Sequence, residues 1–145
     1  MPSYTAGPLF IAQSLLMLGR TDEVQARVER AVELSANEPR RTSNAYSLGA
    51  EAALMRGDDE LARDLARRGI AALPSNAFAH ATLAAADALG GRSDEAATAL
   101  AAFLKLWPDA TVARYDDSRR STHPVYLAQR ERLYEGLRKA GLPQQ

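Results

Sequence analysis

The chain of 145 residues has no cysteine, only two histidines and no net charge. Without thiols it can form neither a disulfide nor a cysteine metal site. Its 18 basic and 18 acidic residues disfavour nucleic acid or an anionic membrane as a partner, because such binders normally carry a basic excess. No apolar run reaches the roughly 18 residues of a membrane span, and the N-terminus lacks the basic and apolar segments of a signal peptide. We therefore expect a cytoplasmic protein.

Residue patterns that indicate catalysis are missing as well. The sequence contains no HExxH, CxxC, GxSxG or phosphate-loop pattern, so metal and phosphate sites lack support. His80 falls in an apolar helical stretch and suits a packing role, whereas His123 precedes a proline and suits a helix cap or the surface. We therefore expect no enzyme activity, no catalytic residue, no metal and no cofactor.

Alanine, in contrast, is abundant, at roughly one residue in five, and favours helix over strand. The sequence also repeats with a fixed spacing. Three pairs of residues lie 34 positions apart: Gly57 and Gly91, Ala62 and Ala96, and Pro74 and Pro108. An earlier copy begins before Gly19, with four extra residues that we place in a polar loop at 37–42.

This repeat resembles the tetratricopeptide repeat (TPR) family, in which paired helices carry small residues at close contacts, glycine in the turn and proline at the end. The first copy departs from the family pattern at Val24 and Ala36. The resemblance implies an all-α, right-handed solenoid in one domain, 1–145. Its repeats would span about 5–38, 43–76 and 77–110, and a C-terminal cap would span about 111–143. Since one helix pair cannot bury both of its faces, neighbouring pairs must stack.

The cap is predicted to contain a helix from Pro124 to Ala140, ended by Gly141 and Pro143. The strings TVARY and HPVYLAQRERLYEGLRKAGLP resemble the C-terminal end of TPR regions in bacterial class III adenylate or guanylate cyclases and winged-helix regulators. The resemblance implies a regulatory region of a signalling protein. These 145 residues contain nothing similar to a cyclase or winged-helix domain.

The family resemblance also implies a concave groove, formed by the first helix of each repeat, that binds a protein or peptide. The implied groove residues are Gln13, Met17, Asn44, Ser47, Glu51, Met55, Phe78, Ala81 and Ala85. Such an apolar groove suits an amphipathic helix or an extended apolar segment. Alternatively, the last helix or a second subunit fills it.

The first helix is predicted to be apolar on all sides, which is typical of a helix with neighbours on both sides. We expect Leu9, Phe10 and Leu16 to form a docking face for a partner or a second copy in a homodimer. The alternatives are an upstream repeat, or a lid formed by the residues before Leu9 or by the loop at Pro39.

One prediction follows from the groove residues. TPR proteins that bind the free carboxylate of a peptide use Lys and Asn at positions that are Leu9 and Gln13 here. Peptides with a free acidic C-terminus should therefore bind no better than their amidated forms. A calorimetric titration of each pair tests this, and a clear preference for the free acid would contradict it.

Overall fold

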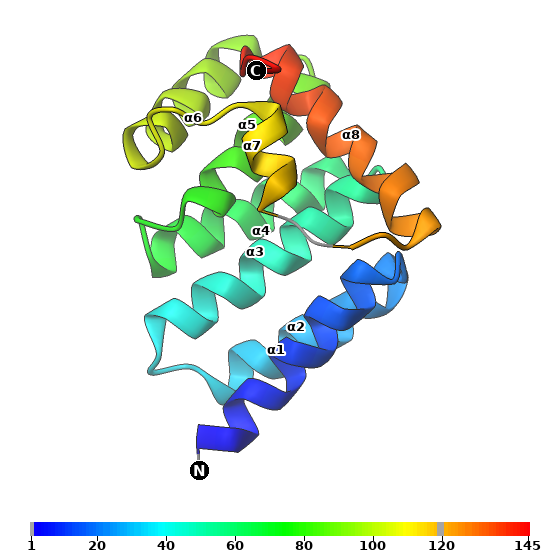
Figure 1. Cartoon of the computed structure of the whole chain (residues 1–145). Helices are drawn as coiled ribbons and strands as arrows, with labels where there is room; N and C mark the ends of the chain where they lie inside the picture. Colours follow the sequence, from blue (N-terminus) through cyan, green and yellow to red (C-terminus); the bar gives the residue numbers. More distant parts are fainter. Residues whose placement is uncertain (1, 119–120) are drawn as a thin grey trace.

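The structure, a computed structural model, describes residues 2–118 and 121–145, and the side chains of 7–118 and 121–145. The described residues form helices and no strand, which confirms the all-α prediction (Figure 1). The helices are α1 (Pro2–Met17), a 3-10 turn (Thr21–Glu23), α2 (Val24–Leu34), α3 (Pro39–Met55), α4 (Asp59–Ala72), α5 (Ala77–Leu89), α6 (Ser93–Leu106), α7 (Val112–Asp117) and α8 (Pro124–Ala140). None of the helices in these ranges combines the length and the apolar character that crossing a bilayer requires.

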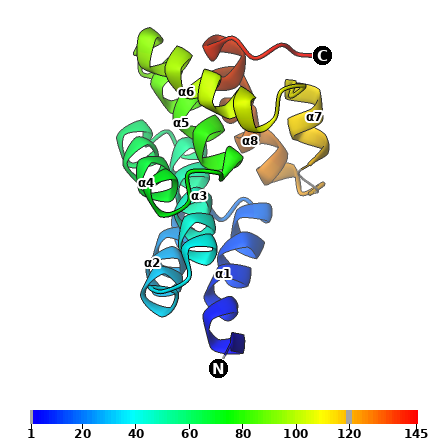
Figure 2. The same ribbon diagram turned by 90° about the vertical axis from the view of Figure 1, so that its left-hand side faces the viewer.

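The first six helices form three hairpins, α1 with α2, α3 with α4 and α5 with α6. Successive hairpins pack side by side, so that α3 contacts both α1 and α5. In Figure 2, α2 and α4 lie on one side of α3, and α7 and α8 lie on the other side. The two ends of the chain are at opposite ends of the array (Figure 1).

The three hairpins share one kind of turn. Gly19, Gly57 and Gly91 have φ of 74°, 91° and 77°, in the left-handed region that a residue with a side chain rarely adopts. After the second of these turns, the carboxylate of Asp58 accepts a hydrogen bond of 3.2 Å from the backbone N–H of Leu61 and caps α4. The 34-residue spacing of the glycines therefore marks equivalent turns in the second and third hairpins.

The extra residues at 37–42 do not form the loop that we expected. Helix α3 begins at Pro39, because proline suits the first helical position, where no backbone N–H is needed. The Thr42 N–H donates to the carbonyl of Glu38 at 3.0 Å, and its hydroxyl donates to the carbonyl of Ser35 at 2.7 Å. The insertion thus adds a turn to α3.

The C-terminal cap contains one more helix than we expected. Thr111 caps α7 by accepting the Arg114 N–H at 3.1 Å, so the polar residues 116–117 continue a helix rather than starting a loop. Helix α8 has the predicted bounds and ends at Gly141, which has φ of 115°. The backbone N–H of Val112 donates to the carbonyl of Pro143 at 2.8 Å and ties the two ends of the cap together.

Helix α8 packs on α3 and α5 through a small residue. Gly136 lies against α5, where a Cβ atom would stand 2.7 Å from the Cβ and 2.9 Å from the carbonyl oxygen of Ala85. Leu133 and Leu137 are buried on the same side of α8. Because the near atoms include backbone, even a methyl group at position 136 must push the helices apart.

We predict that Gly136→Ala destabilises the protein by about 1–3 kcal/mol, because the added methyl group overpacks the contact with α5. Chemical denaturation measures the loss. Glu135→Ala is the control, since it places an alanine on the exposed side of the same helix. The control should be neutral or stabilise, because alanine favours helix. Equal effects of the two variants would refute the close approach.

Candidate functional site

The groove face is the side of α3 and α5 that carries Glu51, Met55, Ala81 and Ala85. These four residues are buried, and α7 and α8 lie over this side of the hairpins (Figure 2). They were predicted to contact a partner, but the chain's own C-terminal segment covers them. The expectation that they form an accessible surface is therefore wrong for this conformation, whereas the alternative in which the last helix fills the groove agrees with the structure.

Tyr115 of α7 anchors the C-terminal segment on the groove face. Its fully buried ring lies edge-on to Phe78 of α5, with centroids 5.5 Å apart, and edge-on to Tyr134 of α8, at 6.2 Å. It also stacks on Trp107, directly after α6, at 6.4 Å and lies 6.3 Å from Phe103 of α6. Its hydroxyl donates to Oε1 of the buried Glu51 at 3.2 Å. A single side chain thus joins α3, α5, α6 and α8.

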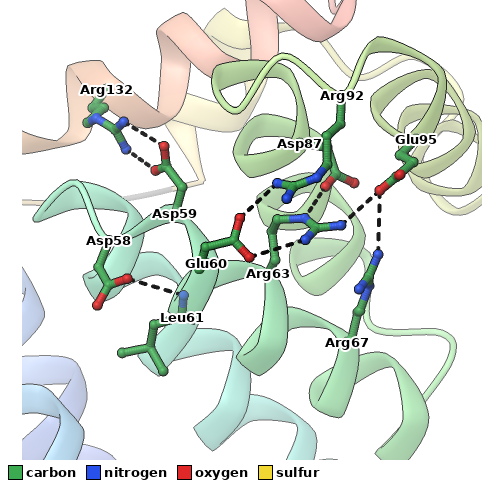
Figure 3. A network of polar contacts seen from close by, with 10 residues as sticks. All are labelled: Asp58, Asp59, Glu60, Leu61, Arg63, Arg67, Asp87, Arg92, Glu95 and Arg132. Atoms are coloured by element: carbon green, nitrogen blue, oxygen red, sulfur yellow. Dashed lines mark hydrogen bonds and ion pairs between the residues drawn. The ribbon is translucent and has the colours of Figure 1, made fainter.

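Polar contacts hold α8 at further points. Arg132 donates to the carbonyl of Leu54 at 2.8 Å. Its two terminal nitrogens pair with the two carboxylate oxygens of Asp59, Nη2 with Oδ2 at 2.9 Å (Figure 3). The hydrogen bond to Asp59 raises the pKa of the Arg132 guanidinium. Burial, and secondly a 2.8 Å hydrogen bond to Asp116, raise the pKa of the Tyr134 phenol. At neutral pH the Arg132 guanidinium therefore stays charged and the Tyr134 phenol stays protonated, as their hydrogen bonds require.

Part of the predicted groove stays open. Four of the predicted residues, Gln13, Asn44, Ser47 and Phe78, line a cavity of about 200 Å³ together with Leu9, Leu48 and Asn76. The amide nitrogen of Asn76 donates to the Ser43 hydroxyl at 2.9 Å, and that hydroxyl donates to the Gly69 carbonyl at 2.7 Å. These two side chains join α5 to the second hairpin, so the exposed Gln13 and Asn44 remain as polar groups that a ligand could reach.

Only part of the docking face predicted on the first helix is exposed. Leu16 is fully buried against the first two hairpins, so it belongs to the core, and Leu9 is half-buried beside the open cavity. Phe10, in contrast, is 68% exposed, and Ile11 and Leu18 are 44% and 43% exposed. Ile11 and Leu18 were not among the predicted residues, because a helix that is apolar on every side has no polar face to mark the side exposed to solvent.

A second hollow lies along this exposed side of α1. Its volume is about 510 Å³, and its lining is Phe10, Gln13, Ser14, Met17, Leu18 and residues 121–123. The predicted groove residue Met17 therefore lies in this hollow and not with Asn44 and Ser47. Helix α1 carries no charged residue. Phe10, Met17 and Leu18 thus give the exposed side of α1 an uncharged apolar surface, and Gln13, Ser14 and residues 121–123 form the polar part of the hollow.

A buried polar network between the second and third hairpins is the other site that could carry chemistry (Figure 3). Arg63 of α4 pairs with Asp87 of α5 at 2.5 Å and with Glu95 of α6 at 2.8 Å. Asp87 is only 1% exposed, and its hydrogen bond raises the pKa of the Arg63 guanidinium. Since Arg63 neutralises this carboxylate, the network links the hairpins and provides no free acid or base.

Each histidine lines a hollow: His80 lies with Arg67, Asp87 and Glu95 in one of about 500 Å³, and His123 lies in the hollow along α1. The ring Nε2 of His80 lies 2.8 Å from the carbonyl of Pro74. Across 2–118 and 121–145, no three side chains of the histidine, aspartate or glutamate type are grouped so that they could hold a metal ion. Comparison of the chain with protein-family models gives no match, and comparison with curated proteins gives none either.

We predict that Asp87→Asn destabilises the protein by about 3 kcal/mol, because it removes the buried charge that compensates Arg63. The control is Glu95→Gln at the partner that is 52% exposed, which should cost about 0–1 kcal/mol. Thermal and chemical unfolding of both variants measures the difference. A loss at Glu95 as large as the loss at Asp87 would show that burial does not set the strength of the pair.

Proposed function

We propose that this chain is a non-enzymatic TPR module that docks to protein or oligomerises through α1, in the regulatory region of a bacterial signalling protein such as a nucleotide cyclase. The observation that carries the proposal is the uncharged apolar surface of α1, in a chain whose groove face is already covered. A folded protein rarely exposes a contiguous apolar patch without a partner for it.

Three features support the TPR assignment. The glycines at 57 and 91 lie 34 residues apart and occupy equivalent turns. The helices form consecutive hairpins that stack on one another. Alanines that the resemblance places at close contacts, Ala50, Ala62 and Ala84, are fully buried. Each hairpin then depends on its neighbours for burial, which is the physical basis of a repeat protein.

The place in a signalling protein rests on the resemblance of the tail. The strings that carry it include Tyr115, which anchors the cap, and Gly136, which permits the contact with α5. The residues that carry the resemblance thus make structural contacts in this chain. In this reading, the cap closes the groove face and directs interactions to the opposite end of the array, where α1 lies.

The second candidate is a stand-alone adaptor that binds an apolar or amphipathic peptide in the groove. The open cavity beside Gln13, Asn44 and Phe78 favours it. A volume of about 200 Å³ accommodates one or two side chains of a ligand. A whole amphipathic helix would require α8 to leave, which exposes Leu133, Leu137 and Tyr115. We therefore rank docking through α1 first.

Photo-crosslinking in the cells that produce the protein tests the two candidates. A benzophenone amino acid is placed at Phe10 on α1, at Asn44 beside the cavity, and at Glu33 on the exposed side of α2 as a control. We expect crosslinked protein adducts at position 10 and none at position 33. Adducts at position 44 alone would favour the adaptor. The absence of adducts at positions 10 and 44 would refute both candidates.

A further inference from the structure

The exposed side of α1 and its last turn carries residues of alternating size. We call this set the outer stripe: Gly7, Phe10, Ile11, Ser14, Met17 and Leu18. At 3.6 residues per turn, Ser14 points away from Ala12 and Leu16, which are both fully buried. The small residues Gly7 and Ser14 lie seven positions apart, and a pair of large residues follows each of them.

With this alternation of sizes, two copies of the outer stripe are complementary when they run in opposite directions. When two copies of α1 lie antiparallel, one offset places Ser14 of each copy opposite Phe10 and Ile11 of the other. The same offset places Gly7 opposite Met17 and Leu18. Every large pair then meets a small residue, so the two backbones can approach closely and the side chains interdigitate. In a parallel symmetric pair, large residues would meet large ones and leave gaps at the small ones.

The surface has room for this packing. The hollow of about 510 Å³ lies at Ser14, between Phe10 and the pair Met17 and Leu18. At Gly7, a Cβ atom would meet no described atom within 4 Å. A large side chain from a second helix can therefore enter at Ser14.

The electrostatics also favour a second copy of the same helix. Residues 2–17 have no charge, so two copies bring no like charges together. Antiparallel helices place the positive end of each helix dipole beside the negative end of the other. A partner with a charged interface would instead have to bury those charges without counter-charges on α1, which is costly.

We propose that two copies of this chain form a homodimer through α1, antiparallel about a two-fold axis, with Phe10 and Ile11 of each copy packed on Ser14 of the other. This inference rests on the proposed docking function and names its partner. A two-fold pair is a closed assembly that uses one surface twice. Because a single helix pair buries a small area, we expect a dissociation constant of about 1–100 µM.

Sedimentation of the purified chain over a concentration series provides the first test. We expect the mass to rise from that of a monomer to that of a dimer. Ser14→Leu adds apolar surface but fills the space for Phe10 and Ile11, so it should weaken the dimer at least about tenfold. Ser14→Ala keeps the residue small and should change the affinity less than about threefold. Stronger association of Ser14→Leu would overturn the proposed packing.

Disulfide crosslinking tests the orientation, and the absence of native cysteine removes any background. Phe10→Cys and Ser14→Cys chains, mixed and oxidised, should form a crosslinked dimer of one chain of each kind. Each variant alone should crosslink poorly, because Ser14 and its own copy are displaced by about 5 Å along the helix axis. Efficient crosslinking of Ser14→Cys to itself would instead indicate a parallel pair and overturn the proposal.

The outcomes separate this inference from the proposed function. A chain that stays monomeric at all concentrations refutes the homodimer. If position 10 nevertheless crosslinks to a different protein in cells, the docking function survives and only the identity of the partner is wrong. If the chain is monomeric and position 10 forms no adduct, both fail together.

Discussion

At Gly136, α8 comes so near to Ala85 of α5 that no side chain fits between the two backbones. This contact lets Leu133 and Leu137 reach the core and brings α8 over the side of α3 and α5 that a peptide would otherwise use. Tyr115 and its hydrogen bond to Glu51 complete the closure. The close approach therefore covers this side of the hairpins, whereas the outer side of α1 stays exposed.

Charged side chains in this protein stabilise contacts between helices. Arg132 fixes α8 to the second hairpin, and Arg63 fixes the second hairpin to the third. Each guanidinium pairs with an aspartate, and the hydrogen bond between them raises the pKa of the arginine. At each junction an arginine paired with carboxylates gives directional contacts, which apolar packing of many similar alanines cannot give alone. The alanines set the distance between helices, and the arginines fix their orientation.

Local signals in the sequence predicted the elements, but not how they cover one another. Helix α8 was predicted from Pro124 to Ala140, because proline and Gly141 mark its ends directly. Pro39 was ambiguous, because the same residue suits a loop and a first helical turn. The family resemblance placed Glu51 and Ala85 in the groove, but their burial depends on Tyr115 and Gly136 of the C-terminal segment, which are far away in sequence. Leu16 and Phe10 belong to a helix that is apolar on every side, so no polar face distinguishes its inner side from its outer side.

Helix α8 also changes how the array should unfold. A stack of hairpins has only contacts between neighbours, so its ends can fray independently. Here Tyr126 packs with Leu16 near the start of the chain, the Ser121 hydroxyl donates to the Met17 carbonyl at 2.8 Å, and Leu137 packs with the third hairpin. The last helix thus braces both ends, and separating either end breaks contacts of the other. The array should therefore lose its structure in one cooperative step, with slow amide hydrogen exchange shared by the first and last hairpins.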